Sequence, residues 1–234
     1  MKSKSIISIA KKEFKSFFIS PIGYIVIGVY LVISGWFFFS TIFLSKSVSL
    51  RDFFGLMPII LSFIIPAITM KSYSEEYNTG SYEMLGTLPI TTMDVAMGKF
   101  LSSWAFSVVM LIPTLSYPLF LSALGDLDSG IVVSGYIGAL LITGSYTAIG
   151  ILASSLTKNQ IIAFLIGSGI CFFLTIIDGM AILLPKSIAG LVQYLSTGYH
   201  LKNAAKGIVD SRDIIYFGSL IYLALMTTGR RVRK

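Results

Sequence analysis

Long apolar runs separated by short polar segments dominate the pattern of this 234-residue chain. A helix needs about 20 apolar residues to cross the roughly 30 Å hydrocarbon core of a bilayer. Runs near that length recur, and we predict six membrane-spanning helices, over Pro21–Leu44, Phe53–Met70, Val95–Leu124, Ile131–Leu156, Ile161–Leu184 and Ile214–Thr228. The pattern therefore predicts an all-α, polytopic membrane protein that forms one transmembrane domain over residues 1–234.

The third and the last of these runs depart from a simple span. The third contains Pro113 and Pro118. Each proline removes a helix hydrogen bond, so we expect this span to kink or to end early. The last run is short, and we expect it to borrow residues from either side.

Small residues recur one turn apart in the fourth run, as Gly144-x-x-x-Ala148 and Gly150-x-x-x-Ser154. Pairs of this kind let two helices approach closely. We expect them to serve packing within the chain rather than a dimer interface.

Residues 1–20 predict an amphipathic helix that lies along the membrane surface. At 100° per residue, apolar side chains gather on one face and polar ones on the other, and Glu13 alone interrupts the apolar face. The apolar face comprises Ile6, Ile7, Ile9, Ala10, Phe14, Phe17 and Phe18, and the polar face comprises Lys4, Ser8, Lys11, Lys12 and Lys15. Such a helix lies in the head-group layer, and the alternative is a disordered basic tail. Ser20 and Pro21 then suit a cap and a first helical position, where the chain turns into the membrane.

The distribution of lysine and arginine predicts the orientation of the chain. With a cytoplasmic N-terminus, the inner segments hold 12 basic and five acidic residues, a net charge of +7. The outer segments hold six of each, a net charge of zero. Because basic residues concentrate on the cytoplasmic side, we expect both termini in the cytoplasm and the chain in the inner membrane of a bacterium. The basic balance then indicates contact with anionic lipid head groups rather than with nucleic acid.

Composition and motifs exclude several classes of protein. Hydrophobic residues make up 55% of the chain and charged residues 12%, about half the charged fraction of a soluble domain. Cys171 is the only cysteine, which excludes a disulfide within the chain, and we expect it to be an apolar packing residue. No Gly-x-x-x-x-Gly-Lys-Ser/Thr sequence is present, so the chain has no P-loop of its own. No His-Glu-x-x-His motif or cysteine pair predicts a bound metal.

Ionisable residues are nearly absent from the interiors of the predicted spans. Proton- or sodium-driven carriers and intramembrane proteases need such groups at membrane depth, so both classes are disfavoured. Asp178 lies near the outer end of the fifth span, where we expect a structural rather than a transport role. His200 is the only histidine. We expect it to be a polar residue at the membrane interface, with a metal-binding or catalytic role as the alternative.

The segment 185–213 is expected outside the cytoplasm. It is too polar to span the membrane and too regularly patterned for a plain linker, so we predict short helices that dip into the outer leaflet. A helix start is predicted at Asp210–Asp213, because acids there face the positive end of a helix dipole. The candidate site residues of this extracytoplasmic segment are Tyr194, His200, Asp210 and Arg212, and a periplasmic or surface accessory protein is a possible partner of the chain.

Residues 71–92 form a polar stretch between the second and third predicted spans. Ser72 and Glu75 fit a capping box, which would start a short helix here. The sequence Asn78-Thr79-Gly80 is expected to end that helix.

A second short helix is predicted directly after this break. Ser81 can cap it, and Glu83 lies in its first turn, where the helix dipole favours an acid. Pro89 is expected to end it. The apolar residues that would share one face of this helix are Tyr82, Leu85 and Leu88. The result would be a short helix held just outside the membrane.

The sequence "EEYNTGSYEMLGTLPIT" resembles the motif of type 2 ABC exporter permeases in the loop after the second span. That motif is a Glu pair, Gly-Thr or Gly-Ser, Glu, two apolar residues and Pro. It maps onto Glu75, Glu76, Gly80, Ser81, Glu83, Met84, Leu85 and Pro89. "GKF" at Gly98–Phe100 is similar to the lysine that follows the motif, and Tyr194–Phe217 looks closest to the gliding-motility-associated branch. The resemblance covers nearly the whole chain.

The resemblance implies that the stretch is a coupling helix, which rests in a groove of a separate ATPase subunit. The implied coupling residues are Glu75, Glu76, Gly80, Ser81, Glu83, Met84, Leu85, Leu88 and Pro89. Glu75 and Glu76 would pair with basic groups on that partner or on the N-terminal amphipathic helix, and a solvated acidic turn is the alternative. The resemblance also implies two ATPase subunits that bind ATP and Mg²⁺, and a second permease subunit, identical or related. This chain itself would bind no cofactor.

Two other functions stay open. In the first, the chain is a membrane anchor or mechanical transmitter, which drives a periplasmic or surface partner through 185–213 without passing a substrate. In the second, it is a passive channel, which the lack of a polar stripe along the spans disfavours.

Overall fold

The computed structural model describes residues 2–45, 49–82, 90–180 and 185–232, which form helices joined by short turns. The helices are α1 Lys2–Ile19, α2 Pro21–Ser45, α3 Arg51–Thr69, α4 Lys71–Thr79, α6 Thr92–Leu111, the 3-10 turn η1 Ile112–Leu115, α7 Ser116–Ser122, α8 Ser129–Ser154, α9 Gln160–Met180, α10 Lys186–Tyr194, α11 Thr197–Ala204 and α12 Ser211–Val232. These described ranges contain no strand, which confirms the predicted all-α fold class.

Five described stretches are long and apolar enough to cross a membrane. They are Pro21–Leu44, Arg51–Thr79, Thr92–Ser122, Ser129–Ser154 and Gln160–Met180. The predicted sixth span lies in α12, which has 22 residues but falls outside this set. Charged residues near both of its ends, including Asp213 and Arg230, shorten its apolar centre. The count of six spans therefore stays a prediction, whereas a multi-pass membrane protein is what these helices indicate.

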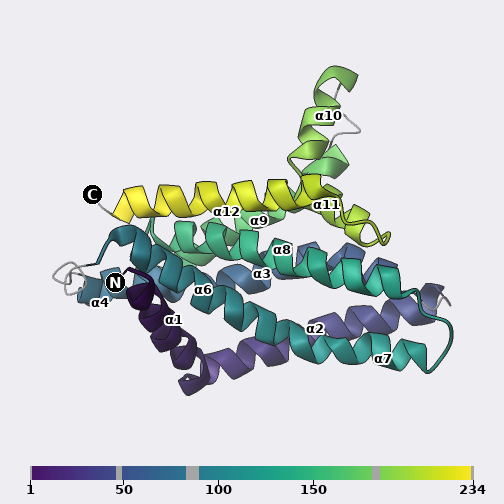
Figure 1. Ribbon diagram of the computed structural model, residues 1–234, viewed down its shortest axis with the longest axis horizontal. Coiled ribbons are helices and arrows are strands. Elements are labelled where there is room, and N and C mark those ends of the chain that lie inside the picture. The colour runs from purple at the N-terminus through teal and green to yellow at the C-terminus, as the bar shows by residue number, and fades with distance from the viewer. Residues whose placement is uncertain (1, 46–48, 83–89, 181–184, 233–234) are drawn as a thin grey trace.

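Helix α8 lies at the centre of the bundle, where it packs against α3, α6, α9, α11 and α12. The long helices run roughly along one axis, and both chain termini lie at the same end of it, which we call the terminal end (Figure 1). Burial differs sharply between the spans: 78% of the apolar window of α8 is buried within the chain, against 17% for α2. The uncovered face of α2, which includes Val32, Trp36 and Phe43, is therefore left for lipid or another chain.

Helix α1 crosses the bundle at an angle at the terminal end and packs along α6 (Figure 1). The rings of Phe17 and Phe18 lie 4.6 and 5.6 Å from the ring of Phe106. Ile9 closes against α6 at Gly98, where a Cβ would lie only 2.7 Å from the Ile9 Cγ2 atom. The chain before α2 is thus helical rather than a disordered tail, and its apolar face meets α6. Its depth in a bilayer stays a prediction.

Local sequence signals place two helix boundaries as predicted. Helix α2 begins at Pro21, and the Ile22 N–H donates to Ser20 Oγ at 3.4 Å. Helix α6 ends at Leu111, and the chain continues as a 3-10 turn that contains Pro113 before α7. The long third run is therefore interrupted because proline cannot donate a main-chain hydrogen bond.

The small residues of α8 allow close packing within the chain, as predicted. A Cβ at Gly150 would lie 2.0 Å from Thr69 Oγ1, and one at Gly144 would lie 3.2 Å from Ile221 Cδ1. The first distance is too short for an added side-chain carbon, and the second is very tight. Helix α8 can therefore touch α3 and α12 directly, with no role required for a second copy of the chain.

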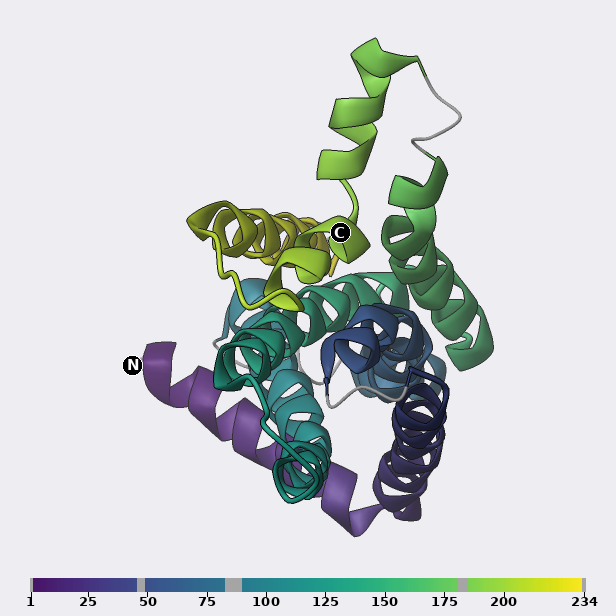
Figure 2. The ribbon, with the colours of Figure 1, turned by 90° about the vertical axis from the view of Figure 1, so that its right-hand side faces the viewer.

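The segment after α9 forms the short helices α10 and α11, while residues 181–184 of the predicted fifth span lie outside the described residues. Helix α10 projects away from the bundle (Figure 2), whereas α11 packs against α3, α8 and α9. Helix α12 starts at Ser211, where the Arg212 N–H donates to Asp210 Oδ1 at 2.9 Å. This confirms the predicted helix start, and the placement of the segment in the outer leaflet stays a prediction.

Candidate functional site

Lys99 joins three helices at the terminal end of the bundle. It lies near the start of α6, and its side chain is only 3% exposed. Its Nζ donates to Glu76 Oε1 of α4 at 2.6 Å and to Glu13 Oε1 of α1 at 3.4 Å. A third bond, at 2.6 Å, reaches the main-chain oxygen of Ser72. We call these four residues the lysine junction.

The lysine junction satisfies the buried ammonium group. Removing a lysine from water is costly unless its charge is paired and its N–H groups are bonded, and here three acceptors meet its three donors. Two carboxylates face this one ammonium, and Glu76 Oε2 is buried with no hydrogen-bond partner among the described residues. The junction therefore holds α1, α4 and α6 together and leaves one carboxylate oxygen unused.

The predicted partners of the acidic pair need a correction. Glu76 was expected to bind the ATPase partner or the N-terminal helix, but it pairs with Lys99 of α6. Glu76 pairs with this lysine because the Lys99 side chain extends from α6 to the face of α4 that is turned toward the bundle. Glu75 is exposed and makes no ion pair with a described residue. Glu13, which interrupts the apolar face of α1, does so because it points inward to the same lysine.

The turn between α3 and α4 is held by a residue of α8. Met70 separates the two helices. Ser154 Oγ accepts hydrogen bonds from the N–H groups of Tyr73 and Ser74, at 2.9 and 3.1 Å, and donates to the Met70 carbonyl at 2.8 Å. Since the first N–H groups of a helix lack partners within it, Ser154 serves α4 as a cap supplied from another helix.

The predicted capping box of Ser72 and Glu75 is therefore wrong. Helix α4 begins before Ser72, directly after Met70, and has no side-chain cap of its own. The predicted end of this helix is confirmed, because Gly80 adopts a left-handed conformation with φ of 71°. Ser81 follows it in helical conformation, with its Oγ 2.9 Å from Thr79 Oγ1.

The second helix predicted in this stretch falls mostly on residues 83–89, which lie outside the described residues. The predicted coupling residues that fall within 83–89 are Glu83, Met84, Leu85, Leu88 and Pro89. Their role and their helical conformation stay predictions.

Tyr82 and Thr92, which lie on either side of residues 83–89, are bonded to the last turns of α12. The Tyr82 hydroxyl donates to the Val232 carbonyl at 3.0 Å, and Thr92 Oγ1 donates to the Gly229 carbonyl at 3.0 Å. Burial, and after it the nearby charge of Glu76, raises the pKa of the Tyr82 phenol. The phenol therefore stays a neutral donor at physiological pH, and the two bonds link α12 to residues on both sides of 83–89.

At the opposite end of the bundle, His200 is buried within the chain, and its place at the membrane interface stays a prediction. Its Nδ1 lies 2.5 Å from Asp213 Oδ1, and its Nε2 lies 3.0 Å from the Tyr194 carbonyl. The imidazole also stacks on Tyr216, with ring centroids 4.1 Å apart. The cause is the fold itself, because the first turn of α12 brings a carboxylate to His200, while the neighbouring Arg212 stays exposed. The pair ties α11 to α12.

Asp178 makes contacts that fit the predicted structural role. Its carboxylate forms an ion pair with Lys202 and accepts a hydrogen bond from Ser196 Oγ at 3.3 Å. These bonds connect the end of α9 to α11. Cys171, in the middle of α9, is fully buried with a free thiol, in keeping with a packing residue.

A comparison with models of protein families shows the family of the chain. A model described as "ABC-2 family transporter protein" matches residues 8–202. The match therefore includes the lysine junction, Ser154 and most of α11. The chain belongs to the ABC-2 transporter family. A comparison with curated proteins gives no match.

An ABC-2 protein is a membrane-embedded subunit of an ABC transporter, and proteins of this family generally work with an ABC ATPase. The resemblance to type 2 ABC permeases is thus confirmed at the level of the family, and the gliding-motility branch stays a prediction. Within the described ranges, no group of three or more His, Cys, Asp or Glu residues could hold a metal ion.

Sequence reasoning on this ABC-2 chain missed two features of the site. One is the burial of Lys99, for which a signal existed: it is the fifth residue of the predicted span Val95–Leu124, where a lysine needs a carboxylate partner. Glu13, alone on an apolar face, was the matching signal. The other is the cap supplied by Ser154, for which the sequence holds no signal, because serine is common wherever helices pack closely.

Proposed function

We propose that the chain is the transmembrane subunit of an ATP-driven exporter, and that α4 and the residues after it receive force from a separate ATPase subunit. The lysine junction is the observation that supports this most strongly. It fastens α4 to α1 and α6 through one buried side chain. A displacement of α4 would therefore move two further helices, rather than bending a loop.

In the proposed complex, two ATPase subunits bind ATP and Mg²⁺, since this chain has no P-loop of its own. A second permease subunit, identical or related, completes the exporter, and the poorly covered face of α2 leaves room for it. The residues proposed to meet the ATPase are Glu75, Gly80, Ser81, Glu83, Met84, Leu85, Leu88 and Pro89. Glu76 would act from inside, through Lys99.

We also propose that the terminal end faces the cytoplasm and that the chain lies in the bacterial inner membrane. The net charge of +7 on the predicted inner segments supports this orientation. Both termini and α4 lie at that end (Figure 1). A cytoplasmic ATPase could then reach α4, which is what the proposal requires.

Glu75→Lys is expected to weaken binding of the ATPase and to lower its stimulated turnover about tenfold. The reason is that Glu75 is proposed to pair with basic groups on the ATPase, and like charges at an interface are strongly unfavourable. Membrane insertion and the unfolding temperature should not change, since Glu75 is exposed and makes no ion pair with a described residue. The measurement is ATP hydrolysis by the complex of the two subunits in proteoliposomes. Glu83→Lys is expected to act in the same way.

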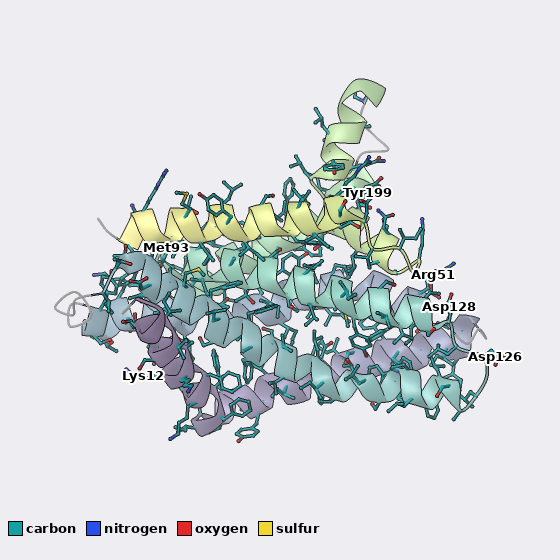
Figure 3. The ribbon with its side chains drawn as sticks, viewed as in Figure 1. Lys12, Arg51, Met93, Asp126, Asp128 and Tyr199 are labelled. Atoms are coloured by element: carbon teal, nitrogen blue, oxygen red, sulfur yellow. The ribbon has the colours of Figure 1, made fainter. Side chains whose placement is uncertain are left out.

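Asp126→Lys is the matched control for this experiment. It makes the same change of charge on an exposed residue at the opposite end of the bundle (Figure 3), and it should leave turnover unchanged. Glu76→Lys should behave differently again and unfold at a lower temperature, because it sets a second cation against Lys99. Normal assembly and turnover in the Glu75 variant, or equal losses in the Asp126 variant, would contradict the proposed coupling.

A second candidate function is that of a mechanical transmitter, which passes no substrate. Helix α12 favours it, because α12 is bonded to the stretch after α4 at one end and to α11 at the other. For the transmitter, ATP turnover should occur without flux of lipid, polysaccharide, drug or peptide in proteoliposomes. Replacing residues 186–192 of the projecting α10 with a Gly-Ser linker should then release a partner that co-purifies with the wild-type complex. Substrate flux in purified proteoliposomes would exclude this function.

A further inference from the structure

A cavity of about 570 Å³ opens beside the lysine junction, between α1, the start of α2, the α3–α4 turn and α6. Its lining changes character along the helices. Charged residues line it at α4 and at Lys99, whereas Ala67, Ile68 and, two turns further along α6, Phe106 line it deeper in the bundle. Val26 continues the apolar wall on α2. The cavity therefore has a charged part around α4 and Lys99 and an apolar part along α2, the end of α3 and α6, as an amphiphile requires.

The charged part of the lining carries balanced charge and unused binding groups. Its lining includes three lysines and three glutamates, which are Lys12, Lys71, Lys99, Glu13, Glu75 and Glu76. Lys99 is already bonded within the junction. Lys12, Lys71 and Glu75 make no ion pair with a described residue, and Glu76 Oε2 is buried without a hydrogen-bond partner there. The cationic groups of Lys12 and Lys71 and the carboxylate of Glu75 are thus left to meet a ligand.

We propose that this cavity binds a zwitterionic phospholipid whose head group carries a phosphate and a primary ammonium, as phosphatidylethanolamine does. The phosphate would lie between Lys12, which reaches out from α1 (Figure 3), and Lys71 of α4. The ammonium would donate to the exposed carboxylate of Glu75, and the acyl chains would follow the apolar wall. Because the lining is neutral overall, an anionic lipid would bring an uncompensated charge.

This ligand fits the site in size and in place. Ligand pockets commonly measure about 300–1,000 Å³, so the cavity can hold a head group, its glycerol and the first methylene groups of the chains. One side of the cavity is formed by α1, whose lysine-rich face is typical of a helix in the head-group layer. The bound lipid would connect α1 to α4 next to the lysine junction. This inference requires a chain in a bilayer, and because Glu75 is also proposed to meet the ATPase, the lipid is tested on the chain without that partner.

The experiment is a lipid titration of the purified full-length chain in mild detergent, followed by native mass spectrometry. Three lipids with identical acyl chains are compared: phosphatidylethanolamine, phosphatidylcholine and phosphatidylglycerol. Phosphatidylethanolamine is expected to bind about tenfold more tightly than either of the others, the ratio that one charge-assisted hydrogen bond supplies. Phosphatidylcholine lacks N–H donors and phosphatidylglycerol lacks the cation. Equal retention of all three lipids would overturn the proposal.

Paired variants locate the site. Lys71→Gln with Glu75→Gln should lower phosphatidylethanolamine binding about tenfold, and Lys12→Gln alone should lower it several-fold. Lys11→Gln with Lys15→Gln is the matched control, because both lysines are exposed on α1 and neither lines the cavity. Losses as large in this control would overturn the site. Free glycerophosphoethanolamine that binds as tightly as the lipid would overturn the lipid as its source.

Discussion

Replacing Lys99 with methionine is expected to lower the free energy of unfolding by about 3 kcal/mol, because breaking a buried ion pair from one side leaves the partner charge unpaired. Methionine keeps most of the volume of the lysine stem but removes all three donors of the junction. Glu76, whose side chain is 20% exposed, and Glu13, at 30%, would then face each other without a cation. The measurement is thermal or denaturant unfolding of the purified chain in detergent. If the proposed function holds, ATPase stimulation should be lost as well, because α4 is no longer fastened to α6.

The neutral triple variant separates charge from packing. Adding Glu13→Gln and Glu76→Gln to Lys99→Met removes every charge of the junction, and such replacements of a buried ion group are often close to neutral. We therefore expect the triple variant to recover most of the lost stability. Lys158→Met, at an exposed position, controls for the loss of a lysine and should change stability little. A Lys99 variant as stable as the wild type would contradict the junction as described.

Ser154→Ala is expected to destabilise the protein by about 2 kcal/mol. The substitution removes the hydroxyl that accepts from the Tyr73 and Ser74 N–H groups, and a buried donor without a partner costs about 1–3 kcal/mol. It also removes the bond to the Met70 carbonyl. Helix α4 would then lose its cap and its link to α8. The loss should be visible as a lower unfolding temperature and as faster exchange of the amide protons of Tyr73 and Ser74.

Ser155→Ala is the control for this prediction. Ser155 is the next residue and is also buried, but its hydroxyl bonds to the Leu152 carbonyl of its own helix. Removing a hydroxyl that bonds within its own helix should cost well under 1 kcal/mol. Equal effects of the two substitutions would show that Ser154 does not act as the cap of α4.

Local sequence signals were enough to predict the helices and several of their ends. Pro113 interrupts the third run, Pro21 starts α2, and Gly80 ends α4 in the left-handed conformation that glycine adopts readily. Each of these effects depends on the residue itself and its immediate neighbours, so it can be read without a fold. The family motif likewise lies within one stretch of chain.

Pairings between distant residues could not be predicted in this way. Lys99 meets Glu13, which is 86 residues away, and Ser154 caps a helix 80 residues earlier in the chain. Nothing within one helix shows which face will meet which neighbour, so Glu13 looked like a flaw in an apolar face. His200 was read from its polar surroundings in the sequence, but the first turn of α12 encloses it. The lysine junction is therefore a tertiary feature that only the fold brings together.

The bonds at the two ends of α12 have a mechanical consequence for the whole bundle. The Tyr82 and Thr92 side chains hold its last turns, and the His200–Asp213 pair holds its first turn. An α-helix transmits a push along its axis with little compression, because its main-chain hydrogen bonds run in that direction. Helix α12 thus resembles a connecting rod, pinned at both ends. A pull on the bonded residues at either end must move α12 along its axis or break these hydrogen bonds, whichever requires less work.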